Sequence, residues 1–128
     1  MRPLDPRETI HQIGTGNMMS ISGGRWGTVG KNGQVYSGRG PGEVWKLLLP
    51  VGHGYRVEIE LAANDTYTVR RVFSRKAPGR RHLPPVDYPK GERTEVYAEE
   101  IGQVAYYASC FRSYDETEWP QLNAEVRM

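Results

Sequence analysis

The feature that most constrains the fold is an alternation of apolar and charged side chains over residues 55–61. The apolar members of this stretch are Tyr55, Val57, Ile59 and Leu61, and the charged members between them are Arg56, Glu58 and Glu60. Successive side chains of a β-strand point to opposite faces, so the pattern predicts a strand with one buried and one hydrated face. Such a strand is typical of an antiparallel sheet that is covered on one side only.

Further strands are predicted on both sides of this one. Residues 44–51 place apolar side chains at every second position, namely Trp45, Leu47, Leu49 and Val51. Residues 66–73 keep the same period but put Arg71 on the apolar face. We therefore expect either a β-bulge near Arg70 and Arg71 or partial cover of both faces.

Shorter segments complete the predicted sheet. Asn32 and Gly33 lie between apolar residues of the stretch 25–37 and favour a hairpin with a type I′ turn. The segment NMMSIS, residues 17–22, is interpreted as a short buried strand that ends at two glycines. Residues 94–97 are a further candidate for a short strand.

Helices are predicted near both ends of the chain. Asp5, Pro6 and Glu8 form the pattern of a capping box, which indicates a helix over residues 6–13. Residues 98–111 carry an apolar stripe at helical spacing, made of Ile101, Val104, Ala105, Ala108 and Phe111. The predicted fold class is α+β: a single antiparallel, hairpin-rich sheet packed by one C-terminal amphipathic helix, with a short N-terminal helix.

Length and composition indicate one domain. The 128 residues suffice for a single core, which we assign to residues 1–112. Residues 75–91 contain four prolines and no helical or strand period, so they are predicted to form a long basic loop. Residues 113–128 are predicted to be an acidic C-terminal tail.

Several classes of protein are disfavoured by the sequence. One cysteine allows no disulfide framework within the chain, and three scattered histidines with one cysteine give no zinc-binding spacing, so neither a metal nor a cofactor is expected. No stretch of 18 apolar residues predicts a membrane span, and residues 1–10 lack the pattern of a secretory signal. We therefore expect a cytoplasmic protein without a membrane partner.

Charge is distributed unevenly along the chain. Residues 70–93 hold eight basic and two acidic side chains and so carry +6, while the other nine basic and thirteen acidic residues carry −4. The basic residues are Arg70, Arg71, Arg75, Lys76, Arg80, Arg81, Lys90 and Arg93. Such clusters favour phosphate backbones, and nearby aromatic rings, Tyr67, Phe73, His82 and Tyr88, would stack on bases. The alternative is an ordinary solvated surface.

Four segments in this order resemble small uncharacterised proteins of actinobacterial phages and related mobile elements. They are NMMSISGGR, LPVGHGY, ANDTYTV and VYAEEIGQVAYYASCF, and the resemblance extends from about Ile10 to Arg112. It implies a phage or prophage origin, and hence the cytoplasm of a bacterial host. It supplies no activity and no catalytic residue.

Three functions follow from these observations. The first is a non-enzymatic phage-type accessory protein that contacts nucleic acid, or an acidic surface of a host protein, through residues 70–93. The second is a protein that modulates a host protein through exposed aromatic residues, with Tyr107 and Trp119 as candidates, or through an edge strand. The third is a small hydrolase with Cys110 or His53 as the reacting group, although Cys110 beside the apolar stripe is more typical of an inert thiol.

Overall fold

A computed structural model describes residues 2–75 and 85–110 of the chain. Three helices and six strands occur in these residues. The helices are α1 (Pro6–Ile13), α2 (Thr15–Ser22) and α3 (Ile101–Ser109). The strands are β1 (Gly27–Gly30), β2 (Val35–Ser37), β3 (Val44–Gly52), β4 (Tyr55–Leu61), β5 (Tyr67–Arg75) and β6 (Val86–Val96).

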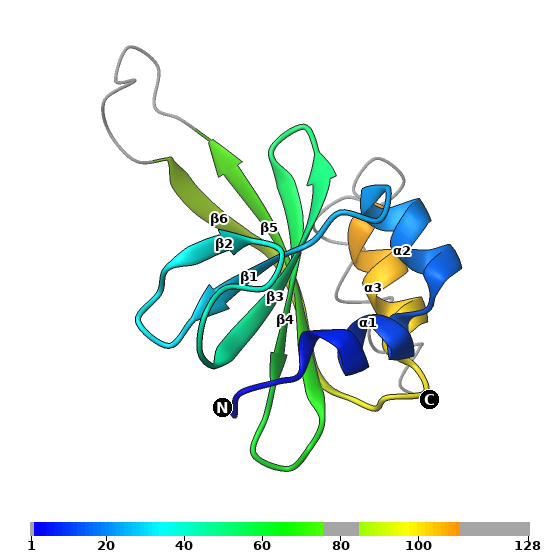
Figure 1. The fold of residues 1–128 in the computed structure, drawn as a ribbon. Helices are drawn as coiled ribbons and strands as arrows, with labels where there is room; N and C mark the ends of the chain where they lie inside the picture. The colour runs from blue at the N-terminus through cyan, green and yellow to red at the C-terminus, as the bar shows by residue number, and fades with distance from the viewer. Residues whose placement is uncertain (1, 76–84, 111–128) are drawn as a thin grey trace.

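The strands form one antiparallel sheet in the order β2-β1-β3-β4-β5-β6. All three helices lie on the same side of this sheet, as Figure 1 shows, and α3 packs against β4, β5 and β6. The opposite side is called the open face below, and none of the helices of the described residues lies on it (Figure 1). The predicted α+β class with a C-terminal helix on the sheet and a short N-terminal helix is therefore confirmed.

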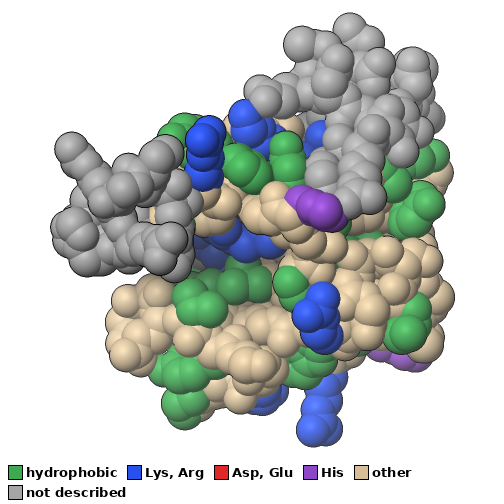
Figure 2. Space-filling view, turned by 90° about the horizontal axis from the view of Figure 1, so that it is seen from above, with side chains coloured by type: hydrophobic (Ala, Val, Ile, Leu, Met, Phe, Trp, Pro, Cys, Tyr) green, Lys and Arg blue, Asp and Glu red, His purple; other side chains and the backbone are tan. Residues whose placement is uncertain are grey.

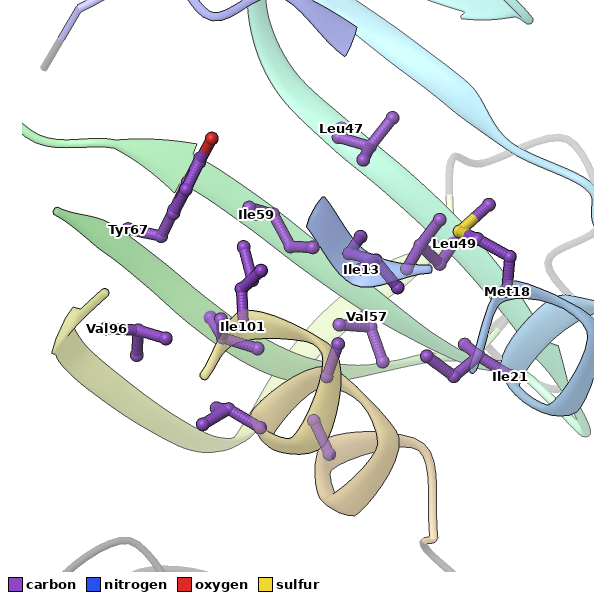
Figure 3. Close-up of a cluster of buried hydrophobic side chains, with 14 of the residues drawn as sticks. Ile13, Met18, Ile21, Leu47, Leu49, Val57, Ile59, Tyr67, Val96 and Ile101 are labelled. Atoms are coloured by element: carbon purple, nitrogen blue, oxygen red, sulfur yellow. The ribbon is translucent and has the colours of Figure 1, made fainter. Parts of the chain in front are cut away.

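The core lies between the sheet and the helices. Alternate side chains of the strands point into it, among them Leu47, Leu49, Val57, Ile59 and Val69, which are all fully buried. Figure 3 shows Ile13, Met18, Ile21 and Ile101 of the three helices reaching toward these strand residues. Gly102 lets α3 approach the first two helices, since a Cβ there would lie 2.5 Å from the carbonyl oxygen of Ile13.

The prediction of a strand over residues 17–22 is wrong, because these residues belong to α2. Met18, Ile21 and Ser22 are buried and follow the i, i+3, i+4 spacing of a helix face. Gly23, in the left-handed conformation, and Gly24 donate to carbonyls of the last helical turn, Met19 and Met18, and so form a helix C-cap. The two glycines therefore mark the end of a helix.

A β-bulge in β3 corrects the predicted face of Trp45. Val29 pairs with Lys46 and Gly30 pairs with Val44, so Trp45 is the extra residue. Val44 is consequently buried in the core, whereas Trp45 lines a cavity on the open face together with Lys46. Strict alternation from residue 45 onward had placed the indole ring in the core.

The hairpin at Asn32 and Gly33 is confirmed, but its turn is not type I′. A type I′ turn needs a positive φ at both central residues, but only Gly33, with a φ of 84°, has one, and the φ of Asn32 is negative. The predicted loop over residues 75–91 is also too long at its C-terminal end, because β6 begins at Val86 and contains Pro89 as part of the edge strand. The N-terminal part of that loop lies outside the described residues.

Candidate functional site

Arg71 points into the protein and stabilises a helix end. The register between β4 and β5 runs without interruption, so Arg71 falls on the face that α3 covers, and its exposed fraction is 2%. Its Nε donates to the carbonyl of Ala108 at 2.7 Å and one terminal nitrogen donates to the carbonyl of Tyr107 at 3.2 Å. A cation at the C-terminus of a helix also complements the helix dipole. Arg71 is thus a structural residue. The predicted irregularity near Arg70 and Arg71 occurs in the β5–β6 ladder, where the register shifts between Arg70 and Val72 and the extra residue is in β6.

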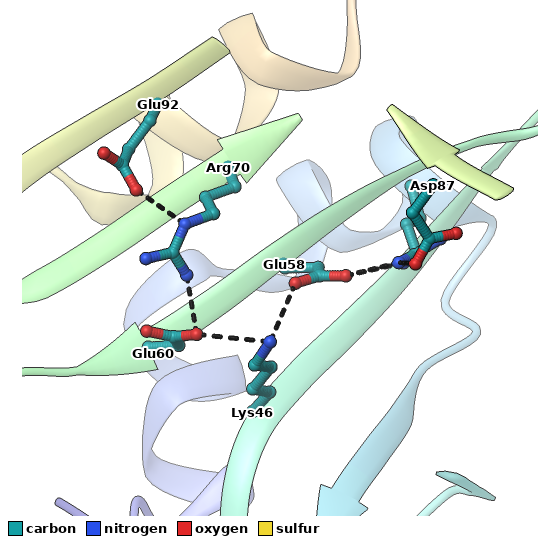
Figure 4. A network of polar contacts seen from close by, with 7 residues as sticks. Lys46, Glu58, Glu60, Arg70, Asp87 and Glu92 are labelled. Atoms are coloured by element: carbon teal, nitrogen blue, oxygen red, sulfur yellow. Dashed lines mark hydrogen bonds and ion pairs between the residues drawn. The ribbon is translucent and has the colours of Figure 1, made fainter. Parts of the chain in front are cut away.

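Arg70 points the opposite way, to the open face, and carboxylates hold it there. Its guanidinium contacts Glu60 at 2.6 Å and Glu92 at 2.6 Å. Lys46 lies 3.4 Å from both Glu58 and Glu60, and so continues the network across β3 and β4 (Figure 4). The positive charge of Arg70 is therefore compensated on both sides.

Arg56 and Asp87 end this network near β6. The Arg56 guanidinium lies 2.6 Å from Glu58 and 2.8 Å from Asp87, and Ser74 also donates to Asp87. Hydrogen bonds from Arg56 and Ser74 lower the pKa of Asp87 below its usual value. Burial alone would lower the pKa of Arg56, but its contacts with Asp87 and Glu58 outweigh burial and raise it. Both groups stay ionised near neutral pH.

The remaining predicted basic residues are divided between the interior and the surface. Arg93 is 2% exposed and donates to Glu100 at 3.1 Å. Arg75 is exposed at the end of β5, and the Lys90 ammonium lies 5.9 Å from the centre of the Tyr88 ring. The other three, Lys76, Arg80 and Arg81, lie outside the described residues. The eight residues thus do not form one surface, but Arg75 and Lys90 both lie on the β5–β6 ribbon.

Three aromatic rings form a row that begins on β4 and crosses the β5–β6 ribbon. Tyr55 pairs with Phe73 in the ladder of β4 and β5, and Phe73 pairs with Tyr88 in the ladder of β5 and β6. Ring centroids are 4.9 Å apart for Tyr55 and Phe73 and 6.3 Å apart for Phe73 and Tyr88. Exposure is greatest at Tyr88, of which 44% is accessible. The row continues toward solvent from the edge of the core.

Alternation along the strands separates this row from the acidic residues. Arg75 lies two residues after Phe73, so both point to the same face. Of the three acids of the ribbon, Asp87 and Glu92 pair with Arg56 and Arg70 on the open face. The third, Glu95, lies at the far end of β6, next to Val96. We call the set Tyr55, Phe73, Arg75, Tyr88 and Lys90 the ribbon surface.

Figure 2 views the end of the molecule from which the β5–β6 hairpin projects. Lys and Arg side chains lie there among hydrophobic ones and a histidine, and no Asp or Glu side chain of the described residues is visible in this view.

The sequence had identified only part of this surface. Phe73, Tyr88 and the two cations were candidates, whereas Tyr55 had been assigned to the core as the first apolar residue of its strand. Tyr67, a candidate for stacking, is buried, and its hydroxyl donates to Gln12 and contacts Thr9. Whether Tyr55 and Tyr67 are buried depends on how far the helices extend along the strands. The local sequence pattern does not contain this information.

The other candidates occupy separate places. Cys110 donates to the carbonyl of Tyr106 at 3.2 Å, just after α3 ends. His53 is exposed in the turn between β3 and β4, with a φ of 55°. Tyr107 packs partly against the core, while Trp119 lies outside the described residues. Within residues 2–75 and 85–110, no three His, Cys, Asp or Glu side chains are arranged to hold a metal ion.

Comparisons with protein-family models, with curated proteins and with solved structures found no match to this chain. None of the helices in the described part of the chain is long and apolar enough to cross a membrane.

Proposed function

We propose that the protein is a non-enzymatic binding protein that contacts single-stranded nucleic acid through the ribbon surface. The observation that carries this proposal is the aromatic row of Tyr55, Phe73 and Tyr88 with Arg75 and Lys90 on the same ribbon. Proteins that bind single strands combine aromatic platforms with cations that follow the phosphate backbone. Both components come from strands whose spacing the sheet fixes.

The charge distribution supports the ribbon surface over the open face. Phosphates are attracted by Arg75, which forms no ion pair within the described residues, and by Lys90. On the open face, by contrast, Arg70 is held between two carboxylates. A phosphate there would have to compete with Glu60 and Glu92 for the same guanidinium.

A small number of cations predicts modest, salt-sensitive binding. For a single strand, the logarithm of the affinity falls with the logarithm of salt concentration by about 0.7 for each neutralised phosphate. Two contacts, from Arg75 and Lys90, predict roughly a sevenfold loss of affinity between 50 and 200 mM salt. Every further contact makes this dependence steeper. A phage-type accessory role, as the sequence resemblance implies, is part of the same proposal.

The test is fluorescence anisotropy with fluorescein-labelled oligo(dT) and oligo(U) of 15 nucleotides. Stacking on one aromatic ring contributes about 1–3 kcal/mol, so Tyr88→Ala should weaken binding at least about fivefold. Arg75→Ala and Lys90→Ala should each reduce the salt slope by about 0.7. Matched controls are Tyr97→Ala, at a tyrosine that is 56% exposed, and Arg7→Ala on α1.

Two results would contradict the proposal. One is the absence of binding by the wild-type chain at 50 mM salt. The other is that Tyr88→Ala, Arg75→Ala and Lys90→Ala bind the oligonucleotides as strongly as the two control variants do. If the protein prefers duplex to single-stranded DNA, it contacts phosphates alone, and the aromatic row does not stack on bases.

A further inference from the structure

The open face of the sheet is hollowed along β3. A cavity of about 750 Å³ is lined by residues of β1, β2, β3, β4 and β6, including Trp45, Leu48 and Glu58. A second cavity of about 610 Å³ includes Trp26 and Pro50 and shares Val35, Leu48 and Arg56 with the first. We call the two cavities together the sheet groove.

The sheet groove follows the direction of the strands. The first cavity contacts Lys46 and Leu48 of β3, and the second contacts Leu48 and Pro50. Alternate residues of a strand lie about 7 Å apart. An extended chain that lies over the open face of β3 therefore passes from one cavity to the next with alternate side chains, which is the spacing of a peptide in β-conformation.

Apolar side chains of the sheet groove and the free edge of β2 favour a partner in extended conformation. Trp45, Leu48 and Val35 supply apolar contact, and Val35 is 68% exposed on the edge strand β2. Within the described residues β2 pairs only with β1, so its other edge is open to a further strand. Large apolar side chains would cover Val35 and the indole ring of Trp45.

The charges that line the sheet groove favour an acidic partner. Its cations are Arg25, Lys31, Lys46 and Arg56, and its acids are Glu58 and Asp87, so the lining carries +2. Both acids contact Arg56 and are thus compensated. Lys31, in the first cavity, and Arg25, in the second, form no ion pair within the described part of the chain. One uncompensated cation therefore lies in each half of the groove.

We propose that the sheet groove binds an extended acidic segment of a partner protein that carries large apolar side chains at every second position. The apolar side chains enter the two cavities, and the acidic ones meet Lys31 and Arg25. This site is independent of the ribbon surface, because the aromatic row lies on the face of the sheet toward the helices and the groove lies on the open face. Nucleic acid is disfavoured here because two carboxylates, Glu58 and Asp87, line the first cavity.

Tryptophan fluorescence gives a direct measurement of binding. The chain has three tryptophans, and two of them, Trp26 and Trp45, line the groove. In a Trp119→Phe background the emission therefore comes from these two tryptophans alone. The probes are three synthetic octapeptides: alternating Glu-Leu, alternating Lys-Leu with the charge reversed, and alternating Glu-Ser without apolar side chains.

The Glu-Leu peptide should shift the emission and saturate, with the other two peptides at least about tenfold weaker. Val35→Ser should weaken binding of the Glu-Leu peptide about tenfold, through the lost apolar contact. Lys31→Glu and Arg25→Glu should each weaken it about two- to fivefold, as exposed ion pairs do. Tyr97→Ser, at a side chain that is 56% exposed and lines neither cavity, and Arg7→Glu are the matched controls and should change nothing.

The proposal is overturned if the Glu-Leu and Lys-Leu peptides bind alike, or if none of them binds at 1 mM. It is also overturned if Val35→Ser binds as the control variants do. Oligo(dT) of 15 nucleotides serves as a competitor. Displacement of the Glu-Leu peptide by this oligonucleotide would overturn the independence of the two sites, whereas failure of oligo(dT) binding alone would contradict only the proposed function.

Discussion

Replacing Arg71 should destabilise the protein far more than replacing its neighbour Arg70. Arg71 is buried and donates two hydrogen bonds to the carbonyls of Tyr107 and Ala108 at the end of α3. Arg71→Ala removes a charged donor, leaves two carbonyls without it and opens a cavity. Each hydrogen bond from a charged group contributes about 1.5–3 kcal/mol, and with the cavity we expect a loss of about 3–5 kcal/mol.

Arg70→Ala is the matched control because the residue type and strand are the same. Arg70 lies on the open face with a side chain that is 30% exposed, and Lys46 still contacts Glu60 when Arg70 is removed. An ion pair of this exposure contributes about 1 kcal/mol or less. Arg71→Met separates the two effects of the buried variant, because it fills the volume but donates no hydrogen bond. We expect it to cost about 2 kcal/mol.

Urea unfolding followed by circular dichroism measures these differences. For an m-value of about 1.5 kcal/mol/M, Arg71→Ala should lower the midpoint by roughly 2–3 M, and Arg70→Ala by less than about 0.7 M. Arg71→Met gives a second value if the alanine variant does not fold. Hydrogen exchange should also show loss of protection in α3 for both Arg71 variants. Equal midpoints for Arg71→Met and Arg70→Ala, with unchanged protection in α3, would refute the reasoning.

Two further predictions concern packing and pH. Gly102→Ala should cost about 1–3 kcal/mol of stability, because its Cβ would lie 2.5 Å from the Ile13 carbonyl oxygen and 2.6 Å from Asn17 Nδ2. The control is Gly16→Ala in α2, whose Cβ meets nothing within 4 Å and which should stabilise the protein by up to about 1 kcal/mol. Thermal unfolding of both variants checks the pair, and a stable Gly102→Ala would contradict the close helix contact. The pKa of Asp87 in the folded protein is lowered below the usual 3.8, so its ionised form stabilises the fold above about pH 4. This contribution is lost as the pH falls through the pKa of the folded state. The difference in urea midpoint between wild type and Asp87→Asn should therefore shrink between pH 5 and pH 2.5, and a constant difference would argue against the contact with Arg56.

Local signals in the sequence were sufficient for several elements. The cap at Asp5 and Pro6 defines α1, because both side chains act within one turn of the helix. The alternation over residues 55–61 gives β4 with its bounds. The prediction of a hydrated second face is wrong, because Glu58 and Glu60 are only 6% and 7% exposed and are covered by their ion pairs with Lys46, Arg56 and Arg70. The apolar stripe also identifies α3, although the helix begins only at Ile101, after Glu100. Each of these signals involves residues that contact one another or the core directly.

Other elements depended on partners that are distant in sequence. A single extra residue at Trp45 reverses the faces of β3 upstream of it, and only the pairing with β1 reveals the bulge. Pro89 can lie in β6 because that strand is at the edge of the sheet, a position that the sequence of the strand does not encode. The aromatic row requires the registers of β4, β5 and β6 together. Composition indicates that aromatic rings are present but not that three of them align.

The basic run over residues 70–93 illustrates why charge counted along a strand does not predict a charged surface. Adjacent residues of a strand point to opposite faces, so Arg70 and Arg71 are separated by the sheet as soon as the strand forms. The carboxylates that compensate Arg70 come from β4 and β6, which lie on either side of β5. A cationic surface therefore requires that the basic residues of paired strands point to one face of the sheet and that the acidic residues point to the other face. Within the described ribbon, Arg75 meets this condition relative to Phe73 and Tyr88, and Arg70 does not.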